Sequence, residues 1–200
     1  MDRLRSIWQS LLPDAEDALL RGRAGLIAIT CLGLMAMALA LILVWFITGD
    51  LAVETVLLGI LLSLLLAGIM ALARTGRVRL ATWLLLGLLL LLITADAASF
   101  GLGSPAATAY VIPVLLAACG LGLPASLGVA LFGSGAVWLI AWGAFAAWYE
   151  PWEPFAVWHL TFTAPFLTVV LWLVALIAGF WNHAVTGVLS GRGDRPGKPS

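Results

Sequence analysis

The sequence predicts an all-α polytopic membrane protein, a bundle of six transmembrane helices preceded by an amphipathic helix at the membrane interface. Three observations predict this fold. Hydrophobic residues make up 63% of the 200 residues and charged residues only 10%, whereas a soluble domain carries roughly a quarter charged residues. The chain contains apolar runs long enough to cross a bilayer. Its basic residues also gather in a few short segments between those runs.

Residues 1–23 are expected to form a cytoplasmic amphipathic segment. Apolar side chains recur there at helical spacing beside basic ones, which is typical of a helix that lies in the interface. The apolar residues are Leu4, Trp8, Leu11 and Leu12, and Arg3 and Arg5 accompany them.

Residues 24–189 are expected to form the membrane domain. Four apolar runs reach the roughly 20 residues that a spanning helix needs, namely residues 24–48, 52–73, 125–148 and 156–181. Two further runs, 80–95 and 108–123, are shorter. Each of these two either recruits flanking small residues to complete a crossing or leaves part of its length as a re-entrant piece.

The distribution of charge favours six crossings. All ten basic residues lie at the N-terminus, in the second connection or in the tail: Arg3, Arg5, Arg21 and Arg23, then Arg74, Arg77 and Arg79, then Arg192, Arg195 and Lys198. By the positive-inside rule all three segments are cytoplasmic, so an even number of crossings separates each from the next. Both termini are then cytoplasmic, and residues 190–200 are expected to be a disordered tail because they have little apolar surface to bury.

Small residues at four-residue spacing predict helix contact faces, since they allow close backbone approach in lipid. One stripe comprises Gly59, Ser63 and Ala67, and another comprises Ser126, Ala130 and Ser134. Contact inside the bundle is the expected use of both stripes, although contact with a second copy would give the same pattern.

Residue types that carry chemistry are scarce, so we do not expect an enzyme. The spans contain no Lys and no midplane carboxylate, and nucleophile elbows, phosphate-binding loops and Cys/His metal clusters are missing from the sequence. Nucleic acid is not an expected partner, because the basic residues lie where topology requires them. We expect no cofactor; a haem or chlorin held axially by His159 or His183 is the alternative.

The best candidate for a binding site is the extracellular entrance of the last span. Pro165 should bend the helix there and open a cavity. His159 and Thr163 lie one turn apart on one face, and an acidic, aromatic connection precedes them. The predicted ligand- or partner-binding residues are Asp96, Tyr110, Trp152, Trp158, His159, Thr163 and Pro165. An interfacial aromatic belt with solvated acids is the alternative interpretation of the same residues.

From Arg79 onward the chain resembles the six-helix membrane sensor module at the N-terminus of bacterial sensor histidine kinases. The matching residues are Thr94-Ala-Asp96, Phe100-Gly-Leu-Gly103-Ser104-Pro105, Tyr110-Val-Ile-Pro113 and Leu121-Gly122-Leu. The resemblance implies a multi-pass protein of the bacterial cytoplasmic (inner) membrane that senses a signal. In that family the last span leads into an output domain, whereas here the sequence ends 19 residues after Trp181.

These observations predict a non-enzymatic membrane module, either sensor-type or an accessory subunit of a larger membrane complex. We expect it to bind a small molecule, a lipid or a partner protein. Its expected partners are membrane lipids and other membrane protein subunits or a separate signalling partner. The alternative is the substrate-binding membrane component of a vitamin-type uptake transporter.

The topology can be tested with an impermeant thiol reagent. Single cysteines at Gly49, Gly103 and Trp152 should react from outside intact cells, and cysteines at Gly76 and Gly193 should react only after the membrane is opened, because basic segments stay inside. Labelling of position 76 from outside would contradict the six-span arrangement.

Overall fold

The computed structural model describes residues 18–48, 53–152 and 156–191, and these residues form helices without any strand. Five helices in this part of the chain are long and apolar enough to cross a membrane, and residues 105–121 form a shorter apolar helical segment. The predicted all-α fold is confirmed for the described residues, and the length and apolar character of these helices are compatible with a multi-pass protein. Residues 1–17 and 192–200, which include most of the predicted amphipathic segment and tail, lie outside the described residues.

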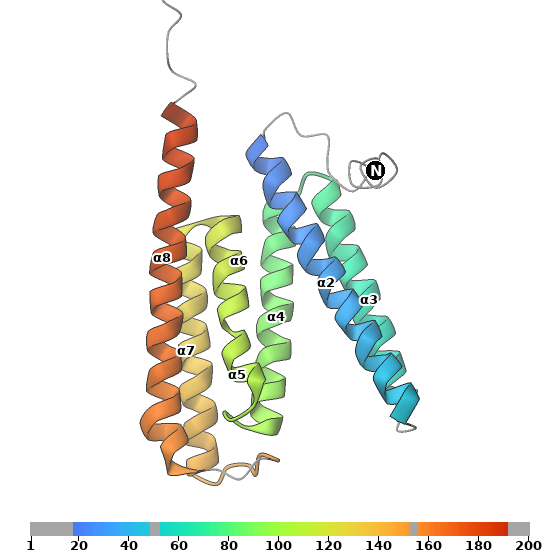
Figure 1. Cartoon of the computed structure of the whole chain (residues 1–200), viewed down its shortest axis with the longest axis vertical. Coiled ribbons are helices and arrows are strands. Elements are labelled where there is room, and N and C mark those ends of the chain that lie inside the picture. Colours follow the sequence, from blue (N-terminus) through green and yellow to red (C-terminus); the bar gives the residue numbers. More distant parts are fainter. Residues whose placement is uncertain (1–17, 49–52, 153–155, 192–200) are drawn as a thin grey trace, which may run out of the picture. The chain divides into compact units, whose positions relative to one another are not determined.

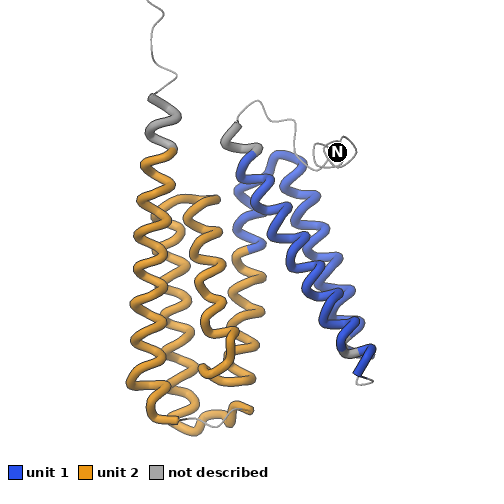
Figure 2. Tube along the Cα trace, viewed as in Figure 1, with its two compact units in different colours: residues 1–85 blue, residues 86–200 orange. Residues whose placement is uncertain are grey.

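The chain divides into two compact units, residues 1–85 and 86–200 (Figure 2). The first unit contains α2 (Ala18–Thr48), α3 (Val53–Arg74) and the beginning of α4 (Val78–Phe100). Residues 18–23, predicted to belong to the interfacial segment, are the first turns of α2. Gly76, at a φ of 83°, forms the tight turn between α3 and α4 that a side chain would strain.

The small-residue stripe on α3, Gly59, Ser63 and Ala67, lies where α3 packs against α2. A Cβ atom on Gly59 would come within 2.6 Å of the Ile42 Cδ1 atom of α2, so glycine permits this approach. The Ser63 hydroxyl donates to the Gly59 carbonyl oxygen at 2.8 Å, which satisfies it within its own helix. Ser63 and Ala67 are half-buried.

The second unit is an up-and-down arrangement of the end of α4, then α5 (Pro105–Ala109), α6 (Val111–Leu121), α7 (Leu123–Phe145), the short π-helix η1 (His159–Thr163) and α8 (Ala164–Gly191) (Figure 1). Helix α8 packs against both α6 and α7.

The second stripe is buried in this unit. Ser126, Ala130 and Ser134 are all buried. The Ser126 hydroxyl lies 2.9 Å from the Leu123 carbonyl oxygen of its own helix and 3.3 Å from the Ala175 carbonyl oxygen of α8. The Ser134 hydroxyl is buried without a hydrogen-bond partner. The stripe therefore serves an internal helix contact in this unit.

The short apolar run predicted at residues 108–123 is a broken helix. Ser104 caps α5, since its hydroxyl oxygen accepts from the Ala106 amide at 3.2 Å, and Pro105 occupies the first turn. Pro113 has no N–H to offer the Ala109 carbonyl four residues earlier, and its ring crowds that carbonyl. Helix α5 accordingly ends at Ala109, and α6 restarts after Tyr110.

Tyr110, at the break, is the largest fully buried side chain of the described chain. Its hydroxyl lies 2.7 Å from the Thr94 hydroxyl of α4. A Cβ atom on Gly133 of α7 would lie 3.3 Å from the Tyr110 Cδ1 atom and 3.2 Å from the Leu171 Cδ1 atom of α8. The Tyr110 ring thus packs against Gly133 of α7, and its hydroxyl joins the break between α5 and α6 to α4.

This packing predicts that two glycine substitutions on α7 have different effects on the stability of the folded protein. Gly133→Leu should destabilise the folded protein by about 1–3 kcal/mol, because the larger side chain overfills the space beside Tyr110. Gly135→Leu is the control, since a Cβ atom there has no neighbour within 4 Å and the gain in helix propensity is the same. Unfolding in mixed detergent micelles, followed by circular dichroism, measures both; equal midpoints would contradict the packing.

Candidate functional site

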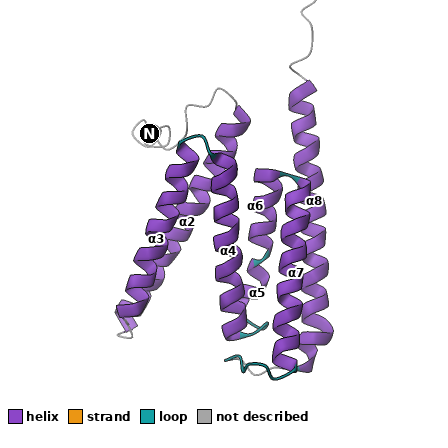
Figure 3. Cartoon of the chain, turned by 180° about the vertical axis from the view of Figure 1, so that it is seen from behind, coloured by secondary structure: helices purple, strands orange, loops and turns teal. Residues whose placement is uncertain are grey.

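The predicted site lies at the end of the second unit where two connections meet, the one after α4 and the one after α7. Figure 3 shows these loops at the same end of α4, α7 and α8. The Trp152 amide donates to the Ser99 carbonyl oxygen at 2.9 Å, and the Trp152 ring lies 6.2 Å from the Phe100 ring. We call residues 99–105, 146–152 and 156–163 the aromatic end of the unit.

The last helix enters the unit through the π-helix η1. The Ala164 amide donates to the His159 carbonyl oxygen, five residues earlier, which is the wide turn of a π-helix. Pro165 follows directly, and its missing N–H leaves the Thr161 carbonyl without its usual α-helical donor. The bend predicted at Pro165 therefore takes the form of a π-helical segment, a feature often found at functional sites.

His159, the first residue of η1, is a buried imidazole with only 6% of its surface exposed. Its Nδ1 atom accepts from the Ala156 amide at 3.3 Å, and its own amide donates to the Ala156 carbonyl oxygen at 2.8 Å. The Trp158 ring covers it at 4.9 Å, tilted by 40°. The imidazole therefore has a defined orientation set by its own helical turn.

A small enclosed cavity of about 10 Å³ lies beside His159, with walls that include Leu102, Tyr149 and Pro151. A single water molecule needs roughly this volume. In this conformation the cavity admits a water-sized group and no drug-sized ligand, which requires about 300 Å³ or more.

Tyr149 reaches the cavity because α7 ends in a Schellman motif. The Trp148 amide donates to the Gly143 carbonyl oxygen at 2.9 Å and the Ala147 amide to the Ala144 carbonyl oxygen at 3.3 Å, with Ala147 at a φ of 53°. Glycine usually occupies that left-handed position, so alanine there is strained. The chain turns back, and the Tyr149 ring packs on Gly143, where a Cβ atom would lie 2.9 Å from it.

The Tyr149 hydroxyl donates to the Ile140 carbonyl oxygen of α7 at 2.9 Å. Burial raises the pKa of this phenol above its ordinary value of 10, because the charged form would be poorly solvated. The hydroxyl is therefore protonated throughout the physiological range and keeps its role as a donor.

The other predicted site residues lie in four different environments. Asp96 is exposed, and its Oδ2 atom lies 3.4 Å from the Ser104 hydroxyl, beside the cap of α5. Trp152 and Trp158 are 84% and 55% exposed and offer aromatic surface. Thr163 carries a buried hydroxyl without a hydrogen-bond partner. Tyr110 lies in the core of the unit, with its hydroxyl directed at Thr94.

The structure thus brings Trp158 and His159 together at the start of η1 and places Trp152 against the end of α4. It places Tyr110 inside the bundle instead of at the entrance. Tyr149 is the site residue that sequence reasoning missed, because its position depends on the reversal at Ala147. A glycine six residues before a tyrosine was the only available signal.

Among the described residues, no group of three or more His, Cys, Asp and Glu side chains could hold a metal ion. His183, the other candidate ligand for a haem or chlorin, is exposed on α8. The 24 residues between it and His159 correspond to about 36 Å along a helix, so the two histidines do not form one site.

Comparison of the chain with protein-family models, with curated proteins and with solved structures finds no match in any of the three. The function therefore has to be argued from the residues themselves.

Proposed function

We propose that this chain is a non-enzymatic integral membrane module, of sensor type or an accessory subunit of a larger complex, that recognises a partner or a small ligand at its aromatic end. In the proposed topology this end faces the outside of a bacterial inner membrane, and both termini are cytoplasmic. The supporting charge pattern is simple: no Lys or Arg lies between Arg79 and Arg192, so the aromatic end has no cationic side chain to hold it inside.

The single observation that carries the proposal is His159 buried in the π-helix η1. A π-helical turn accommodates one extra residue relative to an α-helix and is less stable, so natural chains keep it mainly where it serves a purpose. Here it presents an oriented imidazole beneath exposed aromatic surface. A ligand or partner that contacts Trp158 would act directly on the His159 ring, which lies 4.9 Å away.

The same segment supports a sensor-type role. Helix α8 continues from η1 for 28 residues without a break, a length of about 42 Å. Conversion of η1 to an α-helix would rotate the chain before it by about 100° relative to α8. Recognition at the aromatic end would thereby bias a two-state element that is joined directly to a helix crossing the membrane.

The vitamin-transporter alternative has less support. A substrate-binding component needs a cavity that surrounds its small-molecule substrate, and the enclosed cavity beside His159 measures about 10 Å³. The exposed surfaces of Trp148, Trp152 and Trp158 are better suited to a partner that docks on the aromatic end.

The test is quantitative co-purification of tagged protein from the native membrane with three variants. His159→Phe should lower recovery of the bound partner at least tenfold while expression and helix content stay unchanged. His183→Phe, an exposed histidine of the same helix, is the matched control and should behave as the wild type. A recovered kinase would assign the sensor role, a stoichiometric large complex the subunit role, and an ATPase pair the transporter role.

Normal partner recovery with His159→Phe, combined with loss of assembly in Ser134→Leu, would contradict the proposal. The working surface would then be a helix face, and the aromatic end would be an interfacial belt.

A further inference from the structure

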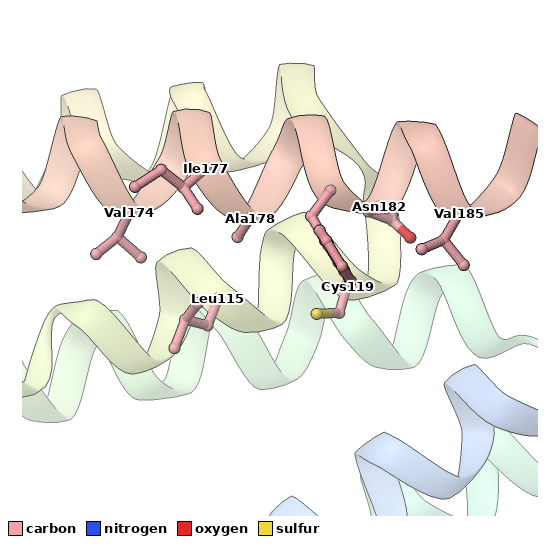
Figure 4. Close-up of a pocket in the computed structure, with 8 residues that line it drawn as sticks. Leu115, Cys119, Val174, Ile177, Ala178, Asn182 and Val185 are labelled. Carbon is pink, nitrogen blue, oxygen red and sulfur yellow. The ribbon is translucent and has the colours of Figure 1, made fainter.

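We propose that an open groove between α6 and α8 holds one acyl chain of an anionic phospholipid from the cytoplasmic leaflet. The groove has a volume of about 520 Å³ and lies within the second unit (Figure 4). Its walls are apolar except for one amide and one thiol: Leu115 and Cys119 come from α6, and Val174, Ile177, Ala178, Trp181, Asn182 and Val185 come from α8. The inference goes beyond the proposed function and shares with it only the membrane topology.

The length of the groove suits a hydrocarbon chain. From Val174 to Val185 the groove follows α8 for about 16 Å, close to the roughly 15 Å of one leaflet's hydrocarbon. An extended acyl chain of this length can lie along the groove against both apolar walls. A helix of a partner or of a second copy in the same groove would leave no phosphatidylglycerol bound, which the lipid-retention test below would reveal.

A hydrogen bond holds the two walls at one end. The Asn182 Nδ2 atom donates to the Ala118 carbonyl oxygen at 2.8 Å. Ala118 is in the last turn of α6, and its carbonyl oxygen also accepts from the Gly122 amide at 3.2 Å, so the Asn182 amide is its second donor. The bond joins α8 to the end of α6 at this end of the groove.

The Asn182 end lies at the level of the lipid headgroups in the proposed topology. Helix α6 ends at Leu121, whereas α8 continues to Gly191. Trp181 is 73% exposed at this level, and tryptophan favours the interface between hydrocarbon and water. An acyl chain in the groove would therefore point toward the midplane and leave its headgroup beside Asn182.

The basic residues that follow α8 in the sequence favour an anionic headgroup. In the sequence from residue 86 onward, the only Lys and Arg residues are Arg192, Arg195 and Lys198, which follow α8 directly. Basic residues next to the cytoplasmic end of a spanning helix attract anionic lipids. The opposite end of the unit carries Asp96 and Glu150 and would repel the same headgroups.

The first test is lipid retention measured by native mass spectrometry after the chain is extracted from vesicles of phosphatidylethanolamine and phosphatidylglycerol. The wild type should retain one phosphatidylglycerol. Ala178→Phe and Cys119→Phe fill the groove from opposite walls, and each should lower that retention at least tenfold. Ala184→Phe adds the same bulk at an exposed position of α8 outside the groove and should retain the lipid.

A second test needs no substitution. The Cys119 thiol is exposed in the groove wall, whereas Cys31, the other cysteine, is buried. Cys119 should react with N-ethylmaleimide at least tenfold more slowly in phosphatidylglycerol nanodiscs than after delipidation in detergent.

Equal retention by the filled variants and the control, or equal retention of the two lipids by the wild type, would overturn the inference, as would an unchanged Cys119 reaction rate. These outcomes leave the proposed function intact. Failure of the topology shows itself separately, as labelling of a cysteine at Gly193 from outside the cell.

Discussion

The second unit depends on the burial of Tyr110. A proline at position 113 interrupts the fourth apolar run, and an interrupted helix in lipid needs other groups to compensate its broken hydrogen bonding. Tyr110 sits at that interruption with no exposed surface, bonds the Thr94 hydroxyl at 2.7 Å and covers Gly133. This side chain therefore joins the break between α5 and α6 to two neighbouring helices, α4 and α7, and helps to hold the broken segment in the unit.

The two ends of this unit differ in ways that follow from local chemistry. The aromatic end is formed by turns and caps: the Schellman motif at Ala147, the Ser104 cap and the π-helix before Pro165. Such segments depend on a few hydrogen bonds and are suited to change conformation when something binds. The groove end is formed by two continuous helices joined through Asn182. In the proposed roles, the apolar groove at that end holds a lipid chain, and the exposed aromatic surface at the other end contacts the recognised ligand or partner.

Composition and charge were sufficient to predict the fold class, since 63% hydrophobic content and long apolar runs leave a multi-pass helical protein as the outcome. The ends of α3 and α7 agreed with the predicted runs within three residues, whereas α2 begins six residues before its run and α8 ends ten residues after its run. The break at Tyr110 was not predicted, although Pro113 was visible, because an apolar run of 16 residues gives no sign of how a proline will be accommodated. Tyr110 was assigned to the binding site because the sequence does not distinguish a tyrosine that faces water at the membrane surface from one that is buried in the core. Tyr149 was missed because the reversal at Ala147 uses a left-handed alanine, which sequence rules reserve for glycine.

The central claim is that residues 105–121, though short and broken, cross the membrane as one span. Cysteine scanning of its two flanks, in a background without Cys31 and Cys119, tests this most directly. Pro105 and Pro124 are both exposed, so a cysteine at either position is accessible to an impermeant thiol reagent. The account predicts that position 105 is labelled only from outside and position 124 only from the cytoplasmic side. Labelling of both positions from the same side would mean that the segment is re-entrant, and it would contradict the six-span bundle.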